Sequence, residues 1–198
     1  MSDPDTNSEQ SRRVGPWLRK NRTLRYENPW IAIYHDEVRT PGDTDGIYGV
    51  VHFKGHAVGV VPIDEAGNTW LVGQYRYTLD AFSWEIPEGG VHQGEDTLAC
   101  AHRELAEETG LRATTMRELQ RLHTSNSITD ERAVLYVATG LTEGPQALEP
   151  TEDIRLRKLP LQEAIAMVLR GEITDAMSVA ALLRLGLTSD VARLTSDV

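Results

Sequence analysis

Three glutamates on one predicted helix are the residues of this chain best placed to do chemistry. Glu104, Glu107 and Glu108 stand at positions i, i+3 and i+4, so a helix would project all three carboxylates from one side. Carboxylates this close repel one another unless a cation compensates them. Hard divalent cations prefer oxygen ligands, and Mg²⁺ leaves several positions to water and substrate phosphate. The spacing therefore predicts a Mg²⁺ site, with Mn²⁺ as the alternative ion.

A solvated helix face is the other interpretation, because Arg103 can form an ion pair with Glu107 at i, i+4. The wider pattern favours a site, since glycines at Gly89 and Gly110 have no role in a solvated helix. Residues 96–109 have an acidic start, helix-forming residues inside, and a glycine ready to end the helix in the left-handed conformation. The sequence therefore predicts a loop from Gly89 followed by this helix.

The full spacing, G-x5-E-x7-R-E-(apolar)-x-E-E-x-G-(apolar), resembles the Nudix box, the signature of hydrolases that cut a nucleoside diphosphate linked to another group. Its positions are filled by Gly89, Glu95, Arg103, Glu104, Leu105, Glu107, Glu108, Gly110 and Leu111. We call residues 89–111 the box.

The resemblance also implies roles for these residues. Glu104 and Glu108 would bind metal directly, and Glu107 directly or through water. The backbone carbonyl of Glu88 would add an oxygen ligand. Glu95 and Arg103 would support catalysis by bracing the site. The bound metal would neutralise pyrophosphate charge and activate a water for in-line attack on phosphorus.

Segments outside the box resemble the ADP-ribose and nucleoside-diphosphate-sugar branch of the family. They are a β-rich N-terminal segment and residues 74–76, 151–155 and 173–180. One departure concerns the substrate: ADP-ribose pyrophosphatases typically have a proline after the box, where this chain has Thr-Ser-Asn-Ser at residues 124–127. The resemblance thus implies hydrolysis of nucleoside diphosphate sugars to a nucleoside monophosphate and a sugar phosphate, with GDP-mannose or ADP-glucose favoured over ADP-ribose.

Two residues outside the box are candidates for substrate binding. Arg76 would hold a phosphate through bidentate hydrogen bonds, and a surface ion pair is the alternative interpretation. Trp30 would stack on a base bound mainly by a partner subunit, and burial in an interface is the alternative there.

The general base is expected outside the box, because a metal-bound carboxylate has a depressed pKa and accepts a proton poorly. Glu152 matches the branch motif around the metal and water site, and Glu149 is the competing candidate. Pro150 stands where relatives can carry the base. A solvated acidic loop with no catalytic role is the alternative.

Composition limits the class of protein and its partners. The chain has 198 residues, with 20 Lys and Arg against 30 Asp and Glu, and its formal charge of −10 argues against a nucleic-acid-binding surface. Cys100 is the single cysteine, so no internal disulfide exists. No apolar run approaches the ~20 residues that span a bilayer, and the first residues lack the pattern of a signal peptide. We therefore expect a cytoplasmic protein with a small-molecule substrate, no nucleic-acid partner and no membrane partner.

The distribution of β-like and helical runs predicts an α+β fold, a Nudix-type α/β/α sandwich with a mixed sheet and a small N-terminal antiparallel β appendage. Residues 1–14 are predicted to form a disordered tail. Residues 15–55 are predicted to form a β-rich segment that pairs with a second subunit in a homodimer, because short strands cannot form a sizeable core alone. Residues 56–198 are predicted to form the catalytic domain.

Two other functions are compatible with the family resemblance. A non-hydrolytic Nudix-like module that senses a nucleotide or a protein partner would be expected to lose box carboxylates, and this box is whole. A nucleoside triphosphate or RNA-cap hydrolase keeps the chemistry and changes the substrate. The β-rich N-terminal segment disfavours the first of these substrates, and the acidic charge disfavours the second.

Overall fold

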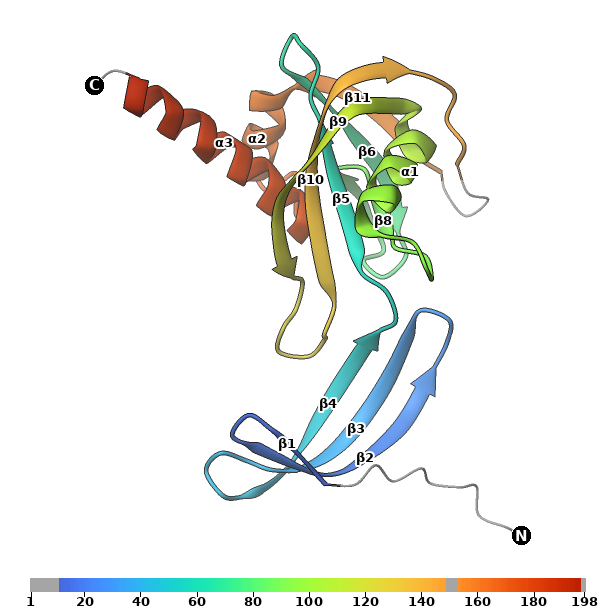
Figure 1. Ribbon diagram of the computed structural model, residues 1–198, viewed down its shortest axis with the longest axis vertical. Coiled ribbons are helices and arrows are strands. Elements are labelled where there is room, and N and C mark those ends of the chain that lie inside the picture. Colours follow the sequence, from blue (N-terminus) through green and yellow to red (C-terminus); the bar gives the residue numbers. More distant parts are fainter. Residues whose placement is uncertain (1–10, 149–152, 197–198) are drawn as a thin grey trace. The chain divides into compact units, whose positions relative to one another are not determined.

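The computed structural model describes residues 11–148 and 153–196 and divides the chain into two compact units (Figure 1). The first unit comprises the chain up to Gly55 together with Ser125–Glu131. The second comprises His56–Thr124 and the chain from Arg132 onwards. Each unit has its own sheets, and the two are described in turn.

The first unit is a four-stranded antiparallel sheet with strand order β1-β2-β3-β4. Its strands are β1 (Arg12–Val14), β2 (Trp17–Glu27), β3 (Ile31–Arg39) and β4 (Asp45–Phe53). The segment Ser125–Glu131 joins the unit because the Val51 backbone N–H donates to the Ile128 carbonyl over 2.9 Å. An antiparallel N-terminal β appendage is therefore present, as the sequence predicts.

Strand β1 differs from the predicted tail of residues 1–14. The structure pairs Val14 with Trp17 and Arg12 with Arg19, so the last three residues of that segment form an edge strand. Composition predicted no strand there because residues 12–14 include a single apolar side chain, Val14, which is 52% exposed. Residues 1–10 lie outside the described part of the chain.

The second unit holds two sheets. The first has strand order β8-β5-β10-β9 and contains one parallel pair, β5 with β10, so it is mixed. The second has order β11-β6-β7 and is antiparallel. The strands are β5 (Ala57–Pro62), β6 (Asn68–Arg76), β7 (Ala81–Glu85), β8 (Glu88–Gly90), β9 (Leu111–His123), β10 (Arg132–Glu143) and β11 (Arg155–Pro160).

Helices cover both sides of this unit (Figure 1). Helix α1 (Thr97–Thr109) contacts β5, β8 and β9, whereas α2 (Leu161–Leu169) and α3 (Ala176–Ser196) lie on the opposite side. Two apolar cores result, one under α1 and one under α2 and α3. Their largest fully buried side chains are Val58, Val60 and Leu105 in the first, and Leu71, Ile86, Leu135, Met167, Ile173 and Leu182 in the second. The predicted α/β/α sandwich is confirmed.

The start of strand β9 differs from what the sequence predicts. The apolar pattern predicts a strand from residue 116, but β9 begins at Leu111, directly after the box. Residues 112–115 are polar or small and mostly exposed, so they carry little apolar signal. In the described part of the chain, every helix is too short or too polar to cross a bilayer.

Candidate active site

Local capping sets both ends of the box helix α1. The Asp96 side chain accepts a hydrogen bond from the Ala99 backbone N–H over 2.8 Å, which satisfies one free donor of the first turn. At the other end, Gly110 has φ 72° and its N–H donates to the Ala106 carbonyl over 2.9 Å. A left-handed residue of this kind ends a helix most easily when it is glycine. The predicted helix and its predicted stop are both present.

The helix turns its acidic side toward strand β8. Glu104 and Glu108 are buried, the latter only 1% exposed, whereas Glu107 is partly exposed. A Cβ atom at Gly89 would overlap the Glu104 carboxylate, so this position of the box accepts only glycine without displacement. The Glu88 backbone N–H donates to Glu108 Oε2 over 2.9 Å. Helix and turn are thus joined through the carboxylates themselves.

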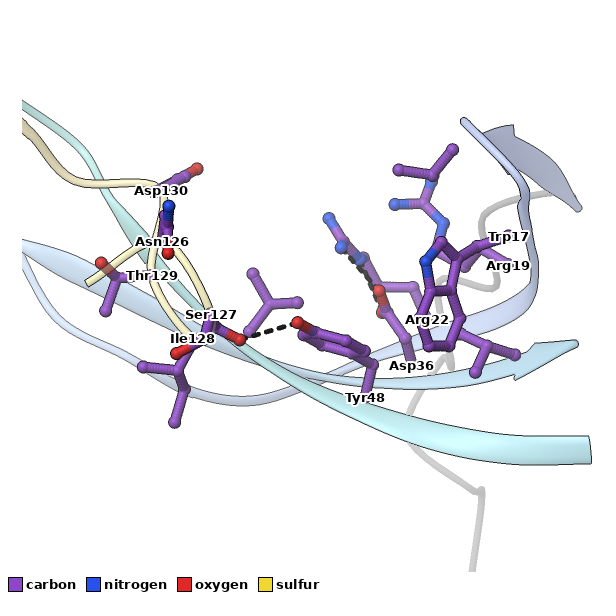
Figure 2. Close-up of a pocket in the computed structure, with 13 residues that line it drawn as sticks. Trp17, Arg19, Arg22, Asp36, Tyr48, Asn126, Ser127, Ile128, Thr129 and Asp130 are labelled. Carbon is purple, nitrogen blue, oxygen red and sulfur yellow. Dashed lines mark hydrogen bonds and ion pairs between the residues drawn. The ribbon is translucent and has the colours of Figure 1, made fainter. Parts of the chain in front are cut away.

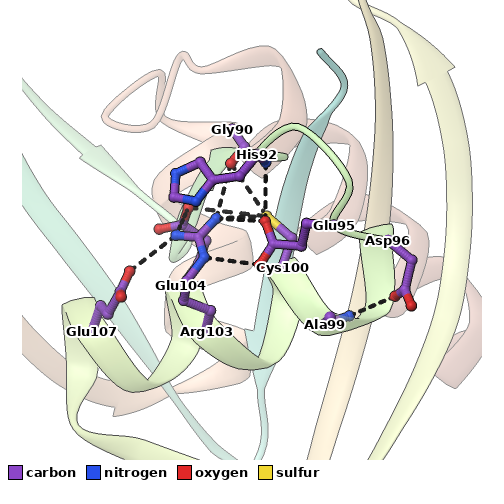
Figure 3. A network of polar contacts seen from close by, with 9 residues as sticks. All are labelled: Gly90, His92, Glu95, Asp96, Ala99, Cys100, Arg103, Glu104 and Glu107. Atoms are coloured by element: carbon purple, nitrogen blue, oxygen red, sulfur yellow. Dashed lines mark hydrogen bonds and ion pairs between the residues drawn. The ribbon is translucent and has the colours of Figure 1, made fainter.

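Arg103 binds three glutamates of the box (Figure 3). Its Nε and Nη2 donate to the two carboxylate oxygens of Glu95 over 2.9 and 3.0 Å. Its Nη1 donates to Glu104 over 2.7 Å and to Glu107 over 3.0 Å, and Nη2 also donates to the Gly90 carbonyl over 2.9 Å. The hydrogen bonds from Arg103 lower the pKa of Glu95 to about 2. The guanidinium therefore offsets the charge of three carboxylates at once.

Cys100 lies inside this network and is fully buried. The Arg103 Nη2 atom is 3.2 Å from its sulfur, and the sulfur is 3.4 Å from the Gly90 carbonyl oxygen. Burial raises the pKa of the Cys100 thiol to about 12, so the group stays a neutral thiol at ordinary pH. It acts as a small packed side chain.

The donor chemistry of this site fits a hard divalent cation. Within the described ranges no three acidic, His or Cys side chains are arranged to hold a metal, and the box carboxylates instead bind Arg103 and the Glu88 amide. The candidate donors are all oxygen atoms, as Mg²⁺ and Mn²⁺ prefer. Buried carboxylates such as Glu104 and Glu108 are costly unless they are paired or coordinate a metal. The absence of a side chain at Gly89 lets the Glu104 carboxylate lie directly against the turn.

Arg76, predicted to bind substrate or to form an ion pair, contacts two carboxylates on the sheet side of the site. Its Nε donates to both oxygens of Glu85 over 2.9 and 3.0 Å, and its Nη2 donates to Glu85 and, over 3.0 Å, to Glu88 Oε1. Burial lowers the pKa of Arg76, but these carboxylates outweigh it and raise the pKa overall. No sequence pattern around Glu85 predicts that it belongs to the site.

The Glu88 side chain is only 7% exposed, and its Oε2 has no hydrogen-bond partner among the described residues while the carboxyl is ionised. Burial raises the pKa of this carboxyl well above its usual value, and the nearby Asp175 and Glu85 carboxylates raise it further. A proton on Glu88 would give it Asp175 as an acceptor. Arg76 is the cation that opposes these effects.

The start of helix α3 is tied to the same turn. Ser178, which is fully buried, accepts a hydrogen bond from the Ile86 backbone N–H over 2.9 Å. The Ser178 backbone N–H in turn donates to Asp175 Oδ2 over 2.8 Å. Asp175 and Ser178 fall within the segment 173–180 that resembles the ADP-ribose branch. Their spacing in the sequence does not explain why these residue types occur there. The contact to Ile86, which directly follows β7 and lies 92 positions away, supplies that reason.

Three further predicted site residues are Trp30, Glu149 and Glu152. Trp30 belongs to the first unit, and its side chain is 73% exposed. Glu149 and Glu152, the candidate general bases, lie outside the described residues.

The first unit contains a pocket of about 330 Å³ (Figure 2). Trp17 and Tyr48 meet edge to face in its wall with ring centroids 5.6 Å apart, and the Tyr48 hydroxyl donates to the Ser127 carbonyl over 2.7 Å. Arg22 and Asp36 form a two-point ion pair in the same wall. None of its lining residues belongs to the box. Two residues of the segment that lacks the expected proline, Asn126 and Ser127, therefore line a pocket of the N-terminal unit.

The sandwich fold and a capped acidic helix packed on a glycine turn together define a Nudix hydrolase. Residues 54–182 match the family described as NUDIX domain, so the chain belongs to the Nudix family. Among its members the chain is a pyrophosphohydrolase.

The comparisons with individual proteins agree with this class. The chain is 39% identical over 156 residues to an ADP-ribose pyrophosphatase of Mycobacterium tuberculosis (strain ATCC 25618 / H37Rv), covering 77% of this chain and 75% of that protein. It is 36% identical over 154 residues to a methanol dehydrogenase activator of Bacillus methanolicus, covering 77% and 83%. A crystal structure of an ADP compounds hydrolase has the same fold, with TM-score 0.80 and 18% identity over 92% of this chain and 98% of that one.

Proposed function

We propose that this protein hydrolyses the pyrophosphate bond of nucleoside diphosphate sugars of the ADP-ribose type, with Mg²⁺ or Mn²⁺ as the required ion. The observation that carries the proposal is the complete box, with Glu104 and Glu108 buried beside the glycine turn at Gly89. A water oxygen attacks one phosphorus, the bridging P–O bond breaks, and the bridging oxygen leaves on the second phosphate. The products are a nucleoside monophosphate and a sugar phosphate.

The metal ligands in this proposal are the carboxylates of Glu104, Glu107 and Glu108 and the backbone carbonyl of Glu88. A bound divalent ion would offset pyrophosphate charge and make water a stronger nucleophile near neutral pH. Arg103 holds Glu104 and Glu107 in place and keeps their mutual repulsion small before the ion binds. Glu95 fixes Arg103 by a two-point ion pair. The proton of the attacking water passes to Glu152 or Glu149.

Two observations support different choices of sugar nucleotide. Similarity to the mycobacterial ADP-ribose pyrophosphatase supports ADP-ribose. The missing proline in residues 124–127 supports a different sugar, such as that of GDP-mannose or ADP-glucose. Arg76 is proposed to contact substrate phosphate with the part of its guanidinium not used by Glu85 and Glu88, and exposed Trp30 to stack on the base.

The proposed assembly is a homodimer in the cytoplasm. The N-terminal unit exposes several large apolar side chains, among them Tyr26, Trp30 and Ile47, which a second subunit would cover. Light scattering at micromolar concentration is expected to give the mass of two chains, and a monomer contradicts this part of the proposal.

The function is tested with the purified protein, a panel of substrates and defined metal. ADP-ribose, ADP-glucose, GDP-mannose, a nucleoside triphosphate and a capped RNA are incubated with Mg²⁺, with Mn²⁺ and with a chelator. Chromatography then separates the phosphorylated products. We expect metal-dependent release of nucleoside monophosphate from at least one sugar nucleotide. Turnover of the triphosphate or the cap alone, or tight nucleotide binding without turnover, contradicts the proposal.

A further inference from the structure

We propose that Glu85 is a positioning residue for the metal-binding turn, which it holds against helix α1 by acting through Arg76. The inference rests on the proposed function, because it assumes that the Glu88 carbonyl and Glu108 are metal ligands. Three consecutive links carry it: Glu85 to Arg76, Arg76 to Glu88, and Glu88 to Glu108.

The first link is a buried two-point ion pair. Glu85 is 2% exposed, and both of its oxygens accept hydrogen bonds from Arg76. Removing these charges from water is costly, so such a pair adds little net stability compared with apolar residues of the same size. Its geometry is specific, however, because the planar guanidinium meets a carboxylate in a fixed fork. Glu85 therefore fixes the direction in which the Arg76 guanidinium points.

The second and third links carry that direction to the site. Arg76 Nη2 donates to Glu88 Oε1 over 3.0 Å, and this side chain is almost completely buried. The same residue donates its backbone N–H to Glu108 Oε2 over 2.9 Å. Because a buried side chain and its own backbone move together, the orientation of Arg76 limits where the Glu88 amide and carbonyl can lie.

Glu85 is well placed for this role because its hydrogen bonds to Arg76 reach the turn from outside the box. It is the last residue of β7, paired with Val72 of β6, and Arg76 is the last residue of β6. Both charged groups therefore stand on the ends of two hydrogen-bonded strands, which are rigid supports. A group that orients the ligands of a metal from outside the ligand set commonly changes metal affinity by roughly 10–100-fold when it is removed.

The test measures metal binding without substrate, by electron paramagnetic resonance titration of free Mn²⁺. Glu85→Gln keeps the shape of the side chain and removes its charge. We expect its Mn²⁺ dissociation constant to rise about 10-fold or more. Arg76→Gln is expected to give a similar rise, and the double variant no more than either single one, because both residues act on one path. The matched control is Glu118→Gln, which breaks an exposed two-point pair with Arg121 on β9 and should leave Mn²⁺ affinity unchanged.

A second variant covers the case in which Glu85→Gln does not fold. Arg76→Lys keeps a positive charge between the two carboxylates but lacks the fork, so it should fold and still bind Mn²⁺ more weakly than the wild type. Wild-type Mn²⁺ affinity in folded Glu85→Gln or in folded Arg76→Lys overturns the inference. The inference is also overturned if the losses of Mn²⁺ affinity in Glu85→Gln and Arg76→Gln multiply in the double variant. If the wild-type protein binds Mn²⁺ but cleaves no sugar nucleotide, the proposed function is wrong. The Mn²⁺ titrations still decide whether Glu85 positions the turn.

Discussion

The Glu88 backbone N–H donates to the Glu108 carboxylate over 2.9 Å, and this hydrogen bond joins the turn before the box to the helix inside it. The two residues are 20 positions apart. Glu88 contributes a main-chain group and Glu108 a buried carboxylate. A substitution at either residue should therefore change the geometry of the site as well as its charge.

Glu108→Gln is expected to lower kcat by roughly 100-fold, a loss typical of removing one charge-stabilising group from a reaction site. The amide oxygen of Gln can still accept the Glu88 N–H, so the turn and the fold should persist. Circular dichroism checks the fold, and steady-state kinetics at saturating Mg²⁺ measure kcat. A kcat near that of the wild type would show that Glu108 is not a metal ligand.

Gly89→Ala should disrupt the site by steric overlap, because the new methyl group would collide with the Glu104 carboxylate. We expect a destabilisation of about 1–3 kcal/mol, as for other insertions into packed regions, together with weaker Mn²⁺ binding. Gly90→Ala is the matched control, since a Cβ at that position meets nothing within 4 Å. Equal behaviour of the two variants in urea unfolding and Mn²⁺ titration contradicts the prediction.

Ser178→Ala tests the attachment of helix α3 to the turn. The substitution leaves the Ile86 N–H buried without its acceptor, which costs about 1–3 kcal/mol in the free energy of unfolding. Ser125→Ala, at an exposed serine, should change that free energy by no more than about 0.5 kcal/mol. Urea denaturation measures both variants, and a loss below this limit in Ser178→Ala would show that the bond contributes nothing.

Acid stability should depend in part on Asp64. Its hydrogen bonds from Lys158 and then from Asn68 hold the pKa of this carboxyl far below its ordinary value of 3.8. A carboxyl with a lowered folded-state pKa stabilises the fold above pH 3.8, and the contribution is lost as the pH falls below that value. Thermal unfolding between pH 7 and pH 2 should therefore show a shallower acid loss in Asp64→Asn than in the wild type. Glu65→Gln, on the same turn, is the charge-matched control, and identical slopes in wild type and Asp64→Asn contradict the assignment.

The general base is tested by comparing Glu149→Gln with Glu152→Gln. One of them should show a large fall in kcat, little change in KM and loss of the acidic limb of the pH–rate profile. The other serves as its control. Wild-type kcat in both variants across the pH range would assign the base to another residue.

The sequence predicts those features best whose physical cause lies within a few residues of them. The start and end of α1 follow from Asp96 and Gly110, which act within one helical turn, and the helical spacing alone brings Glu104 and Glu108 to the same side. The spacing of the box residues also predicted the family, because few other proteins need glycines and carboxylates at these positions.

The supporting contacts could not be predicted because they join residues far apart in sequence. Ser178 meets Ile86 across 92 positions, and nothing near either residue in the sequence signals the pairing. Glu85 follows an aromatic β-like run, where a single charge is easily taken for a solvent-facing one, yet it is 2% exposed. A buried charge requires a partner, but this rule can identify Glu85 only after its burial is known.

The position of Cys100 gives the protein an internal reporter of local opening. Its sulfur is the single thiol of the chain and lies fully buried between the box helix and the Gly90 carbonyl. An alkylating reagent can reach it only when α1 separates from β8, so the rate of alkylation measures the free energy of that separation without any engineered label. A ligand that binds across the helix and the turn would slow alkylation in proportion to its occupancy.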